Sequence, residues 1–170
     1  MACPTWQGGK DWEAGAYSPL TNMMYMPLRH TCGRMMASVD TGWYDLTVRT
    51  EITPGEQTLG TIQAISAETG ETTWTHSQEA FTMSLVTTGG GLVFMGGTND
   101  RLFRAFDATT GVILWEQPTN SGIMGVPSSY AVDGVQYIAI AAGGGINFRG
   151  LTPEIQQPGR GNILFVFRLP

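Results

Sequence analysis

Short apolar runs, each following a turn of glycine or polar residues, recur along the chain. The run at 92–95 follows three glycines, and a second run of charged and apolar residues at 101–106 comes soon after it. Residues 132–143 restate the first run, and 162–168 restate the second. This order of strand, turn and strand is typical of the four-stranded blade of a β-propeller. The pattern therefore predicts an all-β chain of antiparallel strands.

Two eleven-residue segments 41 positions apart, 64–74 and 105–115, carry the same signature. Both have alanine first, Thr-Gly at the sixth and seventh positions, and tryptophan last. Asp107, which stands where the first copy has Ser66, can accept hydrogen bonds from the turn that follows, and glycine is free to adopt a positive φ there. The small alanine leaves room for a tryptophan, which buries roughly 200 Å² when it stacks. We therefore expect a docking motif that joins one blade to the next.

The repeats divide the chain into about three units. Residues 23–26 match the strand at 92–95 but lie 69 positions before it, 28 more than one repeat, so the first unit must contain a long insertion. Long loops in compact domains are usually functional or disordered. The expected units are a partial first blade with an inserted loop within 27–59, a blade at about 77–118, and a last blade at about 119–170 with an insertion at 144–161.

Composition agrees with an all-β chain and excludes several kinds of partner. Glycine accounts for 23 of the 170 residues and charged residues for 14%, and no apolar run approaches the length of a membrane helix. The net charge is −5 and no basic stripe is present, so we expect no nucleic-acid partner and no membrane span. The first residues lack the basic and apolar regions of a signal peptide, which says little about compartment if the chain begins within a longer protein.

Three blades are too few to close a ring. An open stack leaves exposed strand edges and half-buried faces at both ends, which closure ordinarily removes. We therefore expect the chain either to be part of a larger polypeptide or to associate with a separate chain that supplies the missing blades.

The signature resembles the tryptophan docking motif of the eight-bladed quinoprotein alcohol dehydrogenases, which use pyrroloquinoline quinone (PQQ). The most specific stretch is 3–13, Cys-Pro-Thr-Trp-Gln-Gly-Gly-Lys-Asp-Trp-Glu, which is similar to a Cys-Pro-x-x-x-Gly-Gly-Lys-Asn/Asp-Trp segment of that family. The resemblance implies that 1–170 is the C-terminal segment, about three blades of an eight-bladed β-propeller, of a periplasmic enzyme that oxidises an alcohol to an aldehyde. Further similar stretches are 16–19, 59–64, 84–89 and 164–170.

The Gly-Gly-Lys-Asp-Trp stretch carries two candidate cofactor residues. Its glycines let backbone pass close to a flat ligand, while Asp11 offers a carboxylate and Trp12 an indole donor and ring face. The family's Asn or Asp at this place contacts the quinone, so the resemblance gives Asp11 that role. A carboxylate beside a tricarboxylated quinone needs a compensating cation or proton, and Lys10 is a candidate if it turns inward. The alternative is a hydrogen-bonded turn followed by a core aromatic.

Phe81 is the third candidate cofactor residue. It precedes the stretch 84–89, where many family members place a tryptophan that faces the cofactor cavity. Phenylalanine keeps the apolar wall but lacks the indole N–H. The alternative is a plain core aromatic at the start of a strand.

Cys3 and Cys32 bracket the Gly-Gly-Lys-Asp-Trp stretch, and the resemblance implies a disulfide between them. Such a bridge requires an oxidising compartment, which agrees with a periplasmic location. The alternative is two free buried thiols. The chain has no Cys-x-x-Cys-His and therefore no c-type haem site. His30 and His76 have no ligand-spaced partners, so we expect hydrogen-bonded or surface positions rather than metal ligands.

The resemblance places the rest of the chemistry outside this chain. The family's catalytic base, its calcium or lanthanide ligands and the groups beside the quinone carbonyls belong to the preceding, N-terminal part, so we assign no catalytic or metal-binding residue here. The implied partners are those N-terminal blades, a small alcohol and a cytochrome c electron acceptor. The chain is then expected to supply one wall of the quinone site and to be inactive alone.

Two other interpretations remain open. One is a non-catalytic propeller scaffold like the outer-membrane assembly lipoproteins, which carry similar repeats without a cofactor. The stretch 8–12 favours the enzyme, since a scaffold has no reason to bring glycine backbone and a carboxylate to a central channel. The other is an inert truncated product, which concerns this chain rather than its parent.

Overall fold

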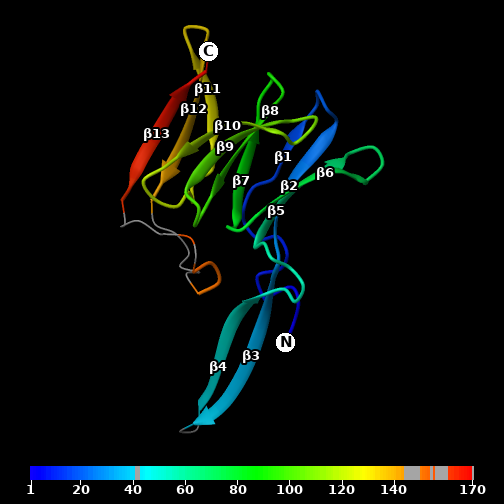
Figure 1. The fold of residues 1–170 in the computed structure, drawn as a ribbon, viewed down its shortest axis with the longest axis vertical. Coiled ribbons are helices and arrows are strands. Elements are labelled where there is room, and N and C mark those ends of the chain that lie inside the picture. Colours follow the sequence, from blue (N-terminus) through cyan, green and yellow to red (C-terminus); the bar gives the residue numbers. More distant parts are fainter. Residues whose placement is uncertain (41–42, 144–149, 154, 156–160, 170) are drawn as a thin grey trace.

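The computed structural model describes residues 1–40, 43–143, 150–153, 155 and 161–169 (Figure 1). All regular secondary structure in this part of the chain is β-strand, as the sequence predicts. The strands are β1 (Ala16–Ser18), β2 (Met23–Arg29), β3 (Thr31–Asp40), β4 (Trp43–Ile52), β5 (Gly60–Ser66), β6 (Thr72–Gln78), β7 (Thr82–Thr87), β8 (Leu92–Gly97), β9 (Leu102–Asp107), β10 (Ile113–Pro118), β11 (Ser128–Val132), β12 (Val135–Ala142) and β13 (Ile163–Arg168).

The strands form three antiparallel sheets and a separate hairpin. The first sheet has the order β1-β2-β5-β6, the second β7-β8-β9-β10 and the third β11-β12-β13, while β3 and β4 pair with each other. The first sheet has four strands, although the sequence predicted a partial unit, because the short β1 pairs along β2. The insertion predicted at 144–161 falls largely outside the described residues.

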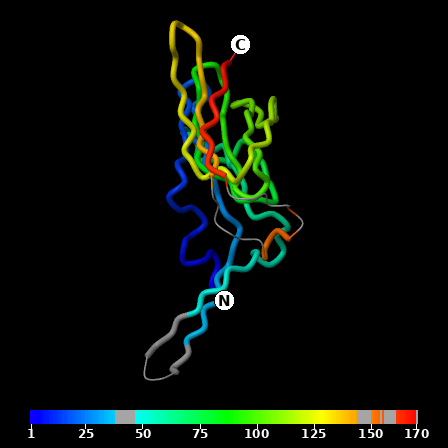
Figure 2. The backbone as a smooth tube through the Cα atoms, turned by 90° about the vertical axis from the view of Figure 1, so that its left-hand side faces the viewer, coloured from blue at the N-terminus to red at the C-terminus, as the bar shows by residue number. Residues whose placement is uncertain are grey.

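The long insertion of the first unit contains the β3–β4 hairpin. It leaves the sheet after β2 and returns at β5, and Arg29 and Gly60 remain register partners across the gap. The hairpin extends away from the three sheets, at the opposite end from the C-terminus (Figures 1 and 2). The insertion therefore adds an arm without interrupting the sheet that bears it.

The repeated signature forms the tight turns that the sequence predicts. Asp107 Oδ1 accepts hydrogen bonds from the backbone N–H groups of Thr109 and Thr110, at 2.9 and 2.8 Å. Gly70 and Gly111 have φ of +74° and +73°. Acceptor and glycine together reverse the chain between an inner and an outer strand of each sheet.

Trp74 docks the first sheet onto the second, which confirms the predicted motif at this junction. Its indole Nε1 donates a hydrogen bond to the backbone oxygen of Ala108, at 3.0 Å, and its ring lies against Gly111. A Cβ at Gly111 would lie 2.6 Å from the indole Cδ2, so a side chain has no room there. The glycine thus serves both the turn and the close approach of the indole.

Trp115, the second motif tryptophan, is less enclosed in this chain. Its residue is 37% exposed, and its ring meets Phe167 of β13 and Phe103 edge-on at centroid distances of 5.1 and 6.1 Å. It lines an apolar groove between β10 and β13.

Both faces of the second sheet are buried. Successive side chains of a strand point to opposite faces, so Val93 and Met95 pack toward the first sheet while Phe94 packs toward the third. On the outer face of the third sheet, the described residues leave four apolar side chains exposed: Tyr130, Val132, Leu164 and Val166.

A charged cluster around the buried Arg104 also joins the first two sheets. Arg104 on β9 pairs with Asp100 and Glu116, each at 2.7 Å, and donates to Gln78 of β6 at 3.1 Å. His76, edge-on to the ring of Phe106 at 4.9 Å, lies beside this cluster. Burial lowers the pKa of His76 from its usual 6.5, and the Arg104 charge lowers it further, while Asp100 and Glu116 act in the opposite direction.

Replacing Trp74 with alanine should lower the free energy of unfolding by about 3–5 kcal/mol, because the indole and its hydrogen bond both disappear from the sheet junction. Trp115→Ala should cost less, since that ring is more exposed. Trp74→Phe, which keeps an aromatic ring but loses the donor, should lie between them. Urea denaturation measures all three, and equal losses for the two alanine variants would contradict the docking role of Trp74.

The free energy of unfolding should fall as the pH is lowered from about 7 to 5. The folded pKa of His76 is depressed, so below the unfolded pKa the unfolded chain binds a proton that the folded chain refuses. His76→Gln should flatten this part of the stability profile. Denaturation at several pH values checks the slope, and an unchanged slope in the variant would show that His76 does not cause it.

Candidate functional site

A disulfide between Cys3 and Cys32 fastens the N-terminal segment beside the start of β3. Backbone hydrogen bonds of 2.9 and 2.8 Å join Ala2 and Gly33 in both directions. The bridge closes a loop with a sequence separation of 29, which corresponds to a stabilisation of about 3–4 kcal/mol on loop-entropy grounds. The segment that holds the candidate residues is therefore tied down at its beginning.

Two glycines turn this segment toward the end of β2. Gly8 has φ +77°, and its N–H donates to the oxygen of Thr5 at 2.8 Å. The oxygen of Gly9 accepts from the backbone N–H of Arg29, also at 2.8 Å. The first atom that a Cβ at Gly9 would meet is 3.9 Å away, so the backbone is uncrowded there.

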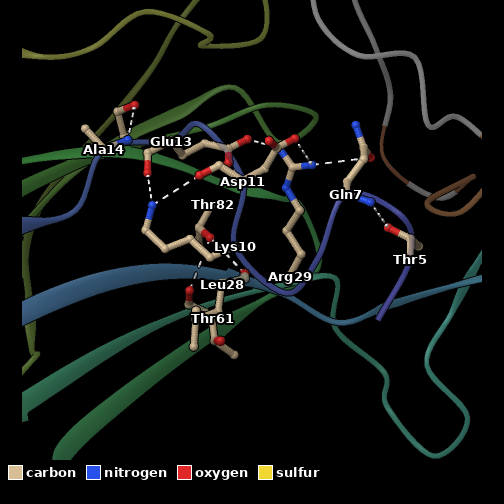
Figure 3. Close-up of polar contacts among 11 residues, drawn as sticks. Thr5, Gln7, Lys10, Asp11, Glu13, Ala14, Leu28, Arg29, Thr61 and Thr82 are labelled. Atoms are coloured by element: carbon tan, nitrogen blue, oxygen red, sulfur yellow. Dashed lines mark hydrogen bonds and ion pairs between the residues drawn. The ribbon is translucent and has the colours of Figure 1, made fainter. Parts of the chain in front are cut away.

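Arg29, the last residue of β2, is the centre of the polar contacts shown in Figure 3. Its side chain is 3% exposed and pairs through Nη2 with Glu13. Nη1 lies 3.5 Å from Asp11 Oδ2 and donates to Gln7 Oε1 at 3.4 Å. The guanidinium carbon lies 5.4 Å from the centroid of the Phe81 ring. One cation thus links the glycine segment, the first sheet and the segment that enters β7.

The charges of this cluster balance. Lys10 Nζ donates to the backbone oxygens of Glu13 and Asp11, at 2.6 and 3.2 Å, so it closes the same turn from the outside. Burial lowers the pKa of Arg29 from its usual value, and the charge of Asp11 opposes that shift. An arginine nevertheless stays protonated. The four side chains therefore carry no net charge, and the cation that contacts the two carboxylates is Arg29.

The second sheet holds the far end of the glycine segment. The Ala14 N–H donates to Ser84 Oγ at 3.0 Å, and the Ala14 oxygen accepts from the Leu85 N–H at 2.9 Å. These bonds fix the residue next to Glu13 on β7, so the carboxylate that pairs with Arg29 is supported by the neighbouring sheet.

Backbone contacts bring the two sheets close together beneath Arg29. Thr82 Oγ1 lies 3.1 Å from the backbone oxygens of both Leu28 and Thr61 (Figure 3). A Cβ on Gly60, the register partner of Arg29, would lie 2.5 Å from the oxygen of Ala80. Glycine at this place permits the approach.

The structure brings Asp11 and Phe81 to the Arg29 cluster, and Trp12 follows Asp11 in the chain. The Asp11 side chain is 32% exposed, and the Trp12 residue is 50% exposed. Phe81 is 2% exposed and lies under the Arg29 guanidinium. A direct contact between Phe81 and a cofactor stays a prediction.

Sequence reasoning missed Arg29 and Glu13. The cation that pairs with the Asp11 carboxylate is Arg29, whereas Lys10 meets backbone oxygens. An arginine that ends an apolar strand, Pro27-Leu28-Arg29, is a signal, but its partners are set by the fold. Glu13, two residues after Asp11, could also have been considered as a partner from the sequence.

The described residues contain no group of three or more His, Cys, Asp or Glu that could hold a metal ion. His30 Nε2 lies 3.0 Å from Thr61 Oγ1, which is the hydrogen-bonded setting expected for it. In the part of the chain that the structure describes, there is also no helix long and apolar enough to cross a membrane.

Comparison with known proteins agrees with the repeats. A family model described as the PQQ-type glucose/ethanol/alcohol dehydrogenase β-propeller domain matches residues 56–138. The quinoprotein ethanol dehydrogenase of Pseudomonas putida is 32% identical over 98% of this chain. This chain belongs to the quinoprotein dehydrogenase β-propeller family. It spans about 28% of the length of that relative.

Two further quinoprotein relatives extend the comparison. Lupanine 17-hydroxylase [cytochrome c] of a Pseudomonas species is 35% identical over 95% of this chain, which spans 24% of it. The solved structure of a europium-containing methanol dehydrogenase aligns with a TM-score of 0.82 and 28% identity, over 98% of this chain and 34% of that one. The three sheets thus have the β-propeller architecture predicted from the repeats.

The residues of the Arg29 cluster fit a PQQ ligand. The uncrowded Gly9 backbone, the partly exposed Asp11 carboxylate and the half-exposed Trp12 ring stand next to one another in the chain. PQQ is itself an anion, so an uncompensated carboxylate would repel it. Arg29 pairs with both Asp11 and Glu13, and Lys10 on the same turn adds a second positive charge, so the carboxylate of Asp11 is compensated.

Proposed function

We propose that this chain supplies one wall of the quinone site in a PQQ-dependent dehydrogenase that oxidises an alcohol to an aldehyde. The observation that carries the proposal is the ion pair between Asp11 and the buried Arg29. Asp11 lies on the loop that contains Gly8 and Gly9, and this loop is bonded to Arg29 through the Gly9 oxygen. When bound, PQQ supplies the electrophilic carbonyl that accepts the substrate's hydride. Asp11 and Trp12 would hold its polar edge and ring, with Phe81 as apolar support.

The remaining chemistry is proposed to come from other blades. The apolar faces left open on the third sheet need a neighbour, and the relatives are more than three times as long as this chain. Those blades would hold a calcium or lanthanide ion, as the europium-containing relative does by name, and the catalytic base. The proposed setting is the periplasm, where Cys3 and Cys32 can be oxidised.

Electrons are proposed to leave through a cytochrome c. The support is the name of one relative, lupanine 17-hydroxylase [cytochrome c]. The proposed substrate class is an alcohol and is not narrowed further. Relatives with similar identity carry names as different as ethanol dehydrogenase and lupanine 17-hydroxylase. The family membership and the Arg29 cluster favour this enzymatic role over a non-catalytic scaffold.

The 170-residue chain alone should show no alcohol oxidation. With PQQ, calcium or a lanthanide, ethanol and a dye acceptor supplied, the base and metal ligands of the other blades are still missing. Dye reduction measures turnover. PQQ-dependent turnover of ethanol by the purified chain would contradict the proposed division of labour.

Asp11→Ala in the assembled propeller should weaken PQQ binding about tenfold, because it removes the polar side chain that Arg29 holds at the open side of the site. The melting temperature of the cofactor-free protein should change little, since this side chain is partly exposed. Titration of PQQ against intrinsic fluorescence gives the dissociation constant. Glu68→Ala, in the exposed turn between β5 and β6, also removes one carboxylate and is the control, and equal affinities for both variants would refute the role of Asp11.

A further inference from the structure

We propose that Arg29 is the positioning residue of the quinone site: it fixes the Asp11 carboxylate by an ion pair, while Glu13 balances the guanidinium from the buried side. This inference rests on the proposed function. It assigns a role to a residue that lies on a strand of the first sheet, outside the Gly-Gly-Lys-Asp-Trp stretch.

The two carboxylates around Arg29 differ in burial. The Glu13 side chain is 2% exposed and the Asp11 side chain 32%, while that of Arg29 is 3% exposed. Glu13 alone gives the buried guanidinium an opposite charge, which is what burial of a cation requires. The contact with Asp11 is therefore not needed to compensate the charge of Arg29. It lies on the exposed side of the cluster.

Arg29 is fixed independently of Asp11. Its backbone N–H is bonded to the Gly9 oxygen, its guanidinium stacks over Phe81, and Nη1 also donates to Gln7. A planar guanidinium held on several sides has one orientation available, so it can define where a mobile carboxylate sits. Asp11, with one face open, is the member of the cluster whose position depends on the others.

The geometry also explains how the neighbouring sheet affects the site. Phe81 lies just before β7, and Glu13 precedes Ala14, which is bonded to Ser84 and Leu85 on that strand. Both groups that hold Arg29 are therefore anchored by the second sheet. The position of Asp11 therefore depends, through Arg29, on how the two sheets dock.

A double-mutant cycle on PQQ affinity tests the proposal in the assembled propeller. The paired variant Glu13→Gln/Arg29→Gln removes one charge of each sign from the interior, which avoids a lone buried charge and leaves Asp11 without its partner. The dissociation constant of PQQ is measured for the unsubstituted protein, Asp11→Ala, the paired variant and the triple variant. Melting temperatures without cofactor report on folding.

We expect Asp11→Ala and the paired variant each to weaken PQQ binding about tenfold, and the triple variant to bind no more weakly than either of them, because Arg29 acts through Asp11. Effects that multiply in the triple variant, or an unchanged dissociation constant in the paired variant, would overturn the role of Arg29 while the proposed function stands. If the unsubstituted protein binds no PQQ, or Asp11→Ala binds it normally, the proposed function fails instead.

Two further variants keep the test decisive. Arg29→Lys keeps the charge but offers a single point donor that cannot bridge both carboxylates, so PQQ binding should weaken about threefold in a folded protein, and normal binding would contradict the proposal. Arg34→Gln/Glu51→Gln removes the exposed ion pair of the hairpin, whose side chains are 55% and 32% exposed, and should leave the dissociation constant unchanged.

Discussion

The close approach of the first and second sheets is the constraint on which both the fold and the candidate site depend. Trp74 holds one contact against Gly111, and Gly60 permits another, where a Cβ would lie 2.5 Å from the Ala80 oxygen. Arg29 belongs to the first sheet and Phe81 to the segment entering the second, so their 5.4 Å contact exists at this spacing. Larger residues at these glycines would move the two sheets apart. The contact between Arg29 and Phe81 would then be lost as well.

The features that depend on local sequence were predictable. Strands follow from short apolar runs, and the signature turn follows from an acceptor and a glycine at fixed places, since each needs information from a few neighbouring residues. The docking of Trp74 was also predictable, because the motif repeats. The second role of Gly111, contact with an indole from another sheet, required the structure. The fourth strand of the first sheet, β1, also required the structure, because it is three residues long.

The charges of the site were predictable in part. The Gly-Gly-Lys-Asp-Trp stretch drew attention to Asp11 and to its need for a cation, but the nearest cation in sequence, Lys10, bonds backbone oxygens instead. Arg29 pairs with Asp11 across 18 positions because β2 ends opposite the glycine segment. Glutamate is rarely fully buried without a partner, so nothing in the residue itself marks Glu13 as interior.

The energetics of buried ions help to explain why one residue of this cluster, Asp11, is partly exposed. An ion pair removed from water often stabilises no more than apolar residues of similar volume, whereas loss of one partner costs about 3–5 kcal/mol. Stability is therefore a weak reason for three charged groups at this place. Arg29 and Glu13 compensate each other in the interior, and the carboxylate that remains, Asp11, is the one with solvent access. A charge held in a defined position at an open surface is what a ligand site requires, so the arrangement is better explained by binding than by folding.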